Sequence, residues 1–170
     1  MASRVPPLPL VLLVLCSSPL LAQPVPAPPA ASPAAQSEQV RSGVRHFERA
    51  FYELTPHKHD VEAAREFDLA VADFERELAA RPGSAEAHRY LGRIWMLRSA
   101  FGKAAAHYDA LLALNPGDID AYALSAAAYA EAGDRATARA RLVAAQERTD
   151  DPRARARLAE YLARLEAETP

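Results

Sequence analysis

The feature that most constrains the fold is a segment that occurs twice at a fixed spacing. ELAARPGSAEAHRY begins at Glu77 and LLALNPGDIDAYAL begins at Leu111, and each carries Pro-Gly followed by a residue that can cap a helix. The same shift along the chain aligns Trp95 with Tyr129. A repeat of about 34 residues is long enough for two helices and a turn, so the repetition predicts a stack of helix pairs.

The remaining pattern is helical throughout. β-branched residues are sparse, Ala and Leu dominate, and no run alternates with a period of two, so we predict an all-α chain. Prolines interrupt the apolar stripes at Pro56, Pro82, Pro116 and Pro152, where a helix interior would lack an N–H donor. The last stripe consists of Leu158, Tyr161, Leu162 and Leu165. Seven helices are predicted, beginning near Ser37, Asp60, Ser84, Phe101, Asp118, Asp134 and Pro152.

The middle copy of the repeat, AEAHRYLGRIWMLRSAFGKAAAHYDALLALNPGD, resembles the tetratricopeptide repeat. The residues that carry the resemblance are Leu91-Gly92, Trp95, Ala104, Tyr108 and Pro116. His88 departs from the pattern, because the family usually has a large aromatic residue there.

The other two copies resemble the family more loosely. In the third, Ser125-Ala126 replaces Leu-Gly, and in the first about ten extra residues, roughly Thr55 to Ala64, separate the two helices. The resemblance implies an α-α superhelix of about three helix pairs plus a C-terminal capping helix. The predicted domain spans residues 37–168, with an atypical repeat at 37–83, repeats at 84–117 and 118–151, and the capping helix at 152–168. A generic bundle of alanine-rich helices is the alternative.

The N-terminus has the layout of a secretory signal peptide. Arg4 precedes an apolar run from Leu8 to Leu15, and small residues follow up to Ala22, where we predict cleavage. Residues 1–22 are thus the predicted signal peptide, and the Pro- and Ala-rich residues 23–36 are the predicted flexible linker. The prediction is a periplasmic or secreted protein without stable membrane insertion after cleavage. A retained anchor and lipidation at Cys16 are the alternatives.

The balance of charges and the lack of catalytic motifs limit the classes of function that this chain can have. The 20 Lys and Arg residues face 22 Asp and Glu residues, a balance that disfavours nucleic acid as a partner. No phosphate-binding loop, nucleophile elbow or metalloprotease helix occurs, so we expect neither an enzyme nor a cofactor. The resemblance implies binding of protein or peptide, as an adaptor or assembly factor.

In the family, the first helix of each unit forms part of an inner, concave wall on which a partner segment is held. The resemblance implies contacts through Arg45, Arg49, Tyr52, Arg89, Arg93 and Met96. On the third unit it implies a wall with room left by small side chains, at Asp120, Ala123, Ala127 and Glu131. Because guanidinium groups bind carboxylates in bidentate fashion, the predicted partner is an acidic peptide or the C-terminus of a chain. The alternative is that arginine, which supplies most of the basic residues, is simply the chain's usual solvated cation.

Two alternative functions remain open. His57 and His59, with Lys58 between them and Asp60 after them, could hold zinc or copper, although a metal site normally has three or four ligands. The chain could also be a purely structural module of an envelope complex that binds through apolar outer faces.

Overall fold

A computed structural model describes residues 36–167. The described residues all belong to one compact unit. The predicted signal peptide, and the predicted linker apart from Gln36, lie outside the described residues.

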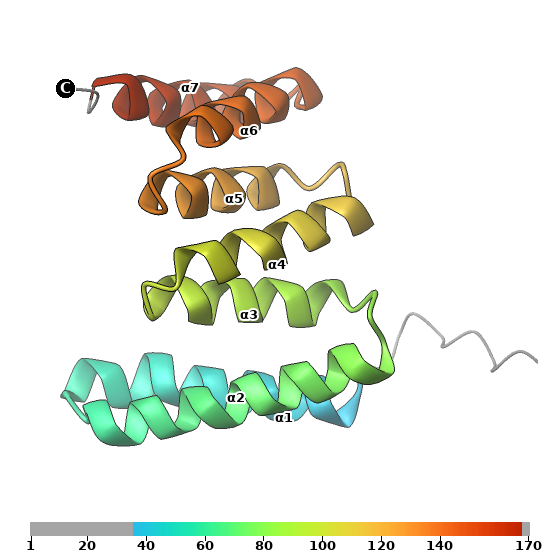
Figure 1. Ribbon diagram of the computed structural model, residues 1–170, viewed down its shortest axis with the longest axis vertical. Coiled ribbons are helices and arrows are strands. Elements are labelled where there is room, and N and C mark those ends of the chain that lie inside the picture. Colours follow the sequence, from blue (N-terminus) through green and yellow to red (C-terminus); the bar gives the residue numbers. More distant parts are fainter. Residues whose placement is uncertain (1–35, 168–170) are drawn as a thin grey trace, which may run out of the picture. The chain divides into compact units, whose positions relative to one another are not determined.

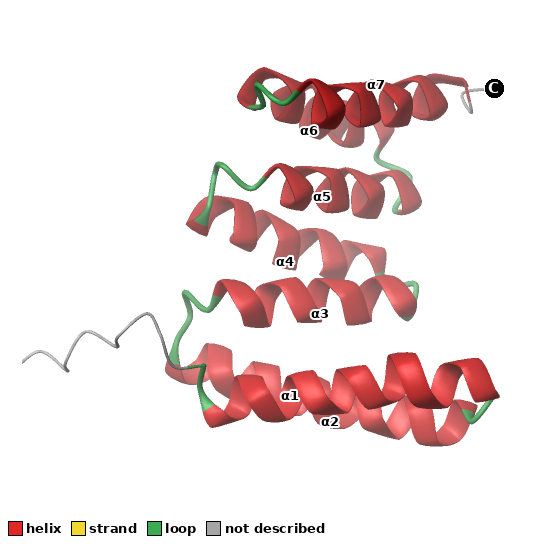
Figure 2. Cartoon of the chain, turned by 180° about the vertical axis from the view of Figure 1, so that it is seen from behind, coloured by secondary structure: helices red, strands yellow, loops and turns green. Residues whose placement is uncertain are grey.

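The described unit consists of helices and turns, and residues 36–167 contain no strand. Its helices are α1 Glu38–Glu48, α2 Asp60–Ala80, α3 Ala85–Leu97, α4 Phe101–Leu114, α5 Ile119–Glu131, α6 Arg135–Arg148 and α7 Pro152–Ala167. After α1 the chain continues through a π-helical segment, η1 (Arg49–Leu54), and a 3₁₀ turn, η2 (Thr55–His57). Each α-helix packs against the next one in the chain, and α3 to α7 follow one another in chain order (Figures 1 and 2). The all-α prediction is confirmed, and none of these helices is long and apolar enough to cross a membrane.

Most helix starts lie where the capping residues predicted them. Ser37, Asp118 and Asp134 occupy N-cap positions, and each side chain accepts a hydrogen bond from the backbone N–H three residues later. Ser84 is also an N-cap residue, but its side chain makes no capping hydrogen bond. Asp60 does not cap α2 as predicted, because it is the first residue of that helix.

Two glycines allow the paired helices to approach closely. A Cβ atom added to Gly92 in α3 would lie 2.5 Å from Cε1 of Tyr108 in α4, and one added to Gly43 in α1 would lie 2.8 Å from Cε1 of Phe74 in α2. Both aromatic rings are fully buried, so each glycine makes room for a ring that cannot move aside. The chain from Gly43 to Phe74 is nearly twice as long as the chain from Gly92 to Tyr108, so the insertion in the first unit is longer than predicted.

The helices of the third unit also pack closely, but with different residues at the contact. Ala126 in α5 and Leu142 in α6 occupy the positions of Gly92 and Tyr108 one repeat later, and both lie in one buried cluster. A leucine leaves room for the methyl group of alanine where an aromatic ring would not. The departure from Leu-Gly in the third unit is therefore matched by a smaller partner.

Trp95 and Tyr129 occupy similar environments in successive units. Each is partly buried and contacts two of the three apolar clusters that form the core. Each also lies beneath a cation, since Lys103 Nζ is 4.3 Å from the centroid of the Trp95 ring and the Arg141 guanidinium is 5.9 Å from that of Tyr129. Their common surroundings support the predicted repetition of the unit.

A polar network joins three helices of the second and third units. Asp109 in α4 accepts hydrogen bonds from Ser125 Oγ at 3.0 Å, Tyr129 Oη at 2.6 Å and Arg141 Nη2 at 2.8 Å. Ser125 is fully buried in α5, so its hydroxyl depends on this carboxylate for its hydrogen bond. The hydrogen bond from Tyr129 to the carboxylate raises the pKa of that phenol, as do burial and the nearby negative charge.

Candidate partner-binding surface

The predicted contact residues of the first unit are exposed, and its arginines are paired. Arg45 lies 3.5 Å from Glu38 in the same helix, and Arg49 lies 3.1 Å from Glu66 in α2. Tyr52 is 62 % exposed and packs edge-on against Phe51. These three side chains therefore offer one exposed ring and two arginines with carboxylates nearby.

The predicted residues of the second unit lie on one face of α3. Arg89 forms an ion pair with Asp118, the N-cap residue of α5, whose carboxylate is only 11 % exposed. Arg93 stacks its guanidinium 4.9 Å from the centroid of the Phe47 ring. Met96 packs against one of the apolar clusters. Arg93 makes no ion pair with any residue of the described unit, so its guanidinium is available to a carboxylate of a partner.

The two sets of residues do not occupy equivalent positions in their units. Counted from the matching glycines Gly43 and Gly92, the counterparts of Arg89, Arg93 and Met96 in α1 are Val40, Val44 and Phe47. Val40 and Phe47 are buried and Val44 packs against the core. Arg45, Arg49 and Tyr52 are thus not at the positions of the first helix that match Arg89, Arg93 and Met96.

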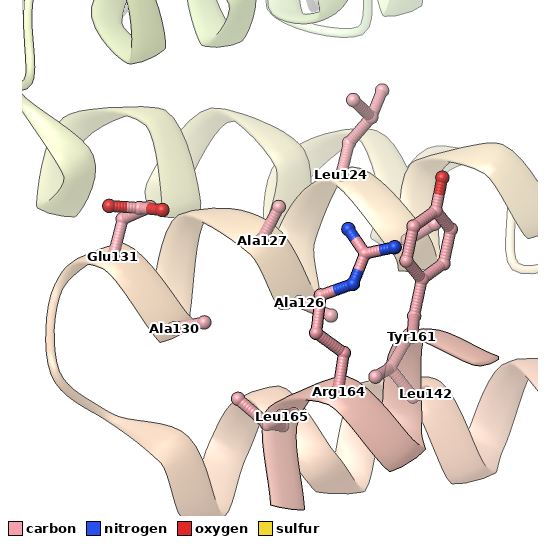
Figure 3. A pocket seen from close by; sticks show the side chains of 10 residues that line it. Leu124, Ala126, Ala127, Ala130, Glu131, Leu142, Tyr161, Arg164 and Leu165 are labelled. Carbon is pink, nitrogen blue, oxygen red and sulfur yellow. The ribbon is translucent and has the colours of Figure 1, made fainter. Parts of the chain in front are cut away.

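A concave feature lies elsewhere in residues 36–167, between α5 and α7. It is a pocket of about 420 Å³ with a mostly apolar lining, and Leu142 of α6 also reaches it (Figure 3). From α5 the lining includes Ala123, Leu124, Ala126, Ala127, Ala130 and Glu131, and from α7 it includes Tyr161, Arg164 and Leu165. Tyr161 and Arg164 rise side by side from α7 towards α5 (Figure 3).

A second pocket of about 260 Å³ adjoins the first and shares Ala123, Leu124 and Tyr161 with it. It adds Asp120 from α5 and Arg157 from α7. We call the two pockets together the α5–α7 groove. Its α5 wall carries two acids, Asp120 and Glu131, and its α7 wall carries two bases, Arg157 and Arg164.

Sequence reasoning found one wall of this groove and missed the other. Four residues that it assigned to the inner wall of the third unit, Asp120, Ala123, Ala127 and Glu131, line the groove. The α7 wall was not predicted, because Tyr161 was grouped with three leucines in the core stripe. Leu158 of that stripe is buried, whereas Tyr161 is 47 % exposed.

The histidines of residues 36–167 are not gathered into one cluster. His59 Nδ1 lies 3.6 Å from Glu62, and residues 36–167 contain no cluster of three or more His, Cys, Asp or Glu side chains that could hold a metal ion. His88 and His107 join α3 to α4 through Nδ1 atoms 3.1 Å apart, and His88 Nε2 lies 3.2 Å from the carbonyl oxygen of Pro82. Burial, together with repulsion from His88, lowers the pKa of His107 to about 4. His107 is therefore neutral at physiological pH.

The geometry defines the class of protein: a stack of antiparallel helix pairs with a groove on the side of its final helices. Residues 59–119 match the family model described as tetratricopeptide repeat. The sequence comparison with curated proteins finds no match.

Two solved structures have the same fold. One is the first tetratricopeptide repeat domain of Spaghetti (RPAP3) bound to the HSP90 peptide SRMEEVD, with 15 % identity, a TM-score of 0.54, and coverage of 75 % of this chain and 93 % of that one. The other is the N-terminal domain of stress-induced protein-1 from C. elegans, with 10 % identity, a TM-score of 0.54, and coverage of 77 % and 99 %. These similarities confirm the superhelical fold predicted from the repeat.

Proposed function

We propose that this chain is a non-enzymatic adaptor or assembly factor that binds a segment of a partner protein on the concave face of its superhelix. The proposal includes an exported compartment, periplasmic or secreted, reached through the N-terminal signal peptide. The binding step is docking against a preformed surface, without covalent chemistry.

The observation that carries the proposal is the α5–α7 groove. The larger of its two pockets, about 420 Å³, is in the range of sites that take up ligands or anchoring side chains, and its lining combines apolar side chains with a few charged groups. The RPAP3 domain, similar in fold, is bound to a short peptide with two glutamates and an aspartate. An acidic partner segment is a reasonable extension to this chain, because α7 carries exposed arginines and α3 carries partly exposed ones.

The second unit supplies further contacts in this proposal. Arg93 and Met96 are partly exposed on α3, and Arg93 has no competing carboxylate within the described residues. Arg89 contributes less, because Asp118 already holds it. Neither alternative function gains a specific observation from the structure: the joint at His57 and His59 brings only Glu62 near an imidazole, and exposed apolar side chains such as Val61 and Leu69 are scattered along α2.

Site-specific photo-crosslinking in the producing cell tests the proposal. A photoreactive residue is placed at Ala127 in the groove or at Arg93 on α3, with exposed Ala106 on α4 as the control. We expect the first two variants to crosslink to the same partner protein and the control to crosslink to none. Equal crosslinking from all three positions, or none from Ala127 and Arg93, would refute binding on this face. Sequencing the N-terminus of the recovered protein tests export, for which a chain beginning at Gln23 is expected.

A further inference from the structure

We propose that the α5–α7 groove is the specificity site of this chain and selects partner segments in which a large apolar side chain lies close to a carboxylate. The apolar side chain occupies the pocket beside Tyr161, and the carboxylate pairs with Arg164 or Arg157. This inference rests on the proposed function and adds the chemistry of the partner to it.

The floor of the groove accepts an apolar group. Small alanines from α5 form one side, and leucines from α6 and α7 close the bottom. Tyr161 stands at the edge with 47 % of its surface exposed, although it is a large aromatic residue on a helix that buries Leu158 nearby. Exposed tyrosines beside an apolar pocket are typical of residues that contribute strongly to protein interfaces. Covering Tyr161 and filling the pocket would remove this apolar surface from water.

The two arginines of the α7 wall are not held by buried carboxylates of residues 36–167. Arg49 and Arg89 pair with carboxylates that are only 12 % and 11 % exposed, so these partners are fixed by the fold. Arg164 pairs with Glu160 at 3.3 Å, but both side chains are more than 60 % exposed, and such a surface pair is worth little. Arg157 is exposed and makes no ion pair with residues 36–167. A carboxylate from a partner can therefore bind on this wall at low cost.

The acidic α5 wall favours one orientation of the bound segment in the groove. Asp120 and Glu131 are exposed on α5, and neither pairs with a cation of the described unit. They repel an acidic group from α5, while Arg157 and Arg164 attract it to α7. A groove with one acidic and one basic wall fixes how a charged segment lies in it, because the reversed orientation places like charges together.

The chain's own N-terminal segment lacks the required chemistry. Residues 1–36 contain no Asp or Glu, so they offer no side-chain carboxylate to Arg157 or Arg164. The proposed occupant is therefore a segment of another protein, and a second copy of this chain is an outcome that the experiment must be able to reveal.

The test is selection from a random displayed peptide library on the full chain, followed by affinity measurements with the selected peptides. Ala127→Phe fills the groove from an exposed position of α5, and Ala106→Phe is the matched control on α4. Arg164→Glu reverses one charge of the α7 wall, and Arg153→Glu is the control on the same helix, outside the groove. Thermal unfolding verifies that all four variants remain folded.

We expect the selected peptides to share an apolar residue next to a carboxylate. Ala127→Phe and Arg164→Glu should each weaken their binding by about tenfold or more, while the two controls leave it unchanged. Replacing the carboxylate of the peptide with lysine should restore binding to Arg164→Glu, a result that a general loss of structure could not produce.

Three outcomes would overturn the inference. Peptides that bind Ala127→Phe normally but are lost in Arg93→Ala would place the site on α3, leaving the proposed function intact. A wild-type dimer that dissociates in Ala127→Phe would show that a second copy occupies the groove. Failure of the wild-type chain to select any peptide would contradict both the inference and the proposed function.

Discussion

The close approach of α3 to α4 predicts that Gly92→Ala is destabilising, although alanine is the better helix former. The new Cβ atom would lie 2.5 Å from Cε1, 2.7 Å from Cζ and 2.9 Å from Cδ1 of Tyr108. These are atoms of a rigid ring that is fully buried, so the helices must separate or the ring must leave its preferred position. Overpacking of this kind costs about 1–3 kcal/mol. The higher helix propensity of alanine returns about 1 kcal/mol. We therefore expect a net loss of up to about 2 kcal/mol in the free energy of unfolding.

Gly102→Ala is the matched control, because a Cβ atom at Gly102 meets nothing within 4 Å. It should leave stability unchanged or raise it by up to about 1 kcal/mol. The assay is urea unfolding followed by circular dichroism, with unchanged denaturant dependence as the sign that only stability differs. Tyr108→Leu in the Gly92→Ala background reproduces the pair Ala126 and Leu142 of the third unit and should recover part of the loss. If Gly92→Ala is as stable as Gly102→Ala, the helices are not in contact at Gly92 and the repeat packing described above is wrong.

Three further predictions concern polar groups between the helices. Tyr108→Phe should stabilise the protein by about 1 kcal/mol in the same urea assay, because the buried hydroxyl has no hydrogen-bond partner in the described unit. Burial also raises the pKa of this hydroxyl to about 12. A destabilised variant would show that the hydroxyl is bonded. Asp109→Ala should lower the free energy of unfolding by about 2–3 kcal/mol, since it removes the acceptor shared by Ser125, Tyr129 and an arginine of α6. The control is Asp68→Ala, at an exposed aspartate. A smaller loss in Asp109→Ala than in this control would argue against the network. For His107, whose pKa falls from 6.5 to about 4 on folding, the unfolded chain binds the proton more readily, so stability is complete above pH 6.5 and decreases as the pH falls towards 4. After allowance for solvent screening this loss is about 1–2 kcal/mol, and it should be absent in His107→Gln when unfolding is measured across that pH range.

Helix type and most helix boundaries could be predicted from the sequence because they depend on local patterns. Pro82-Gly83 and Pro116-Gly117 interrupt apolar stripes that are periodic on both sides, and the structure ends α2 and α4 just before them. The length of the insertion in the first unit was underestimated because the apolar stripe of α1 continues through η1 to Leu54, just before Pro56. The local pattern therefore does not mark where α1 ends and the extra residues begin.

The site was less predictable because it depends on contacts between distant residues. Arg89 is held by Asp118, which lies in the next repeat, and no pattern within α3 reveals this pairing. Tyr161 belongs to an apolar stripe wider than the surface that α6 can cover, so periodicity alone cannot tell which member of the stripe remains exposed. A guanidinium counted from the sequence is thus only a candidate, and its availability depends on the neighbours that the fold provides.

The departures of the third unit from the repeat pattern and the presence of the groove have a common physical basis. The family match ends at residue 119, where α5 begins, and α5 carries alanine at most of the positions that face α7. Ala126 replaces a glycine because Leu142 replaces an aromatic ring, so the helix pair keeps a tight core with a small side chain at this position of α5. Large residues at Ala123, Ala127 and Ala130 would fill the space between α5 and α7 and leave a continuous, closed surface. The small residues therefore keep α5 packed on α6 while leaving the side towards α7 open, and this is the physical condition for a partner's side chain to enter.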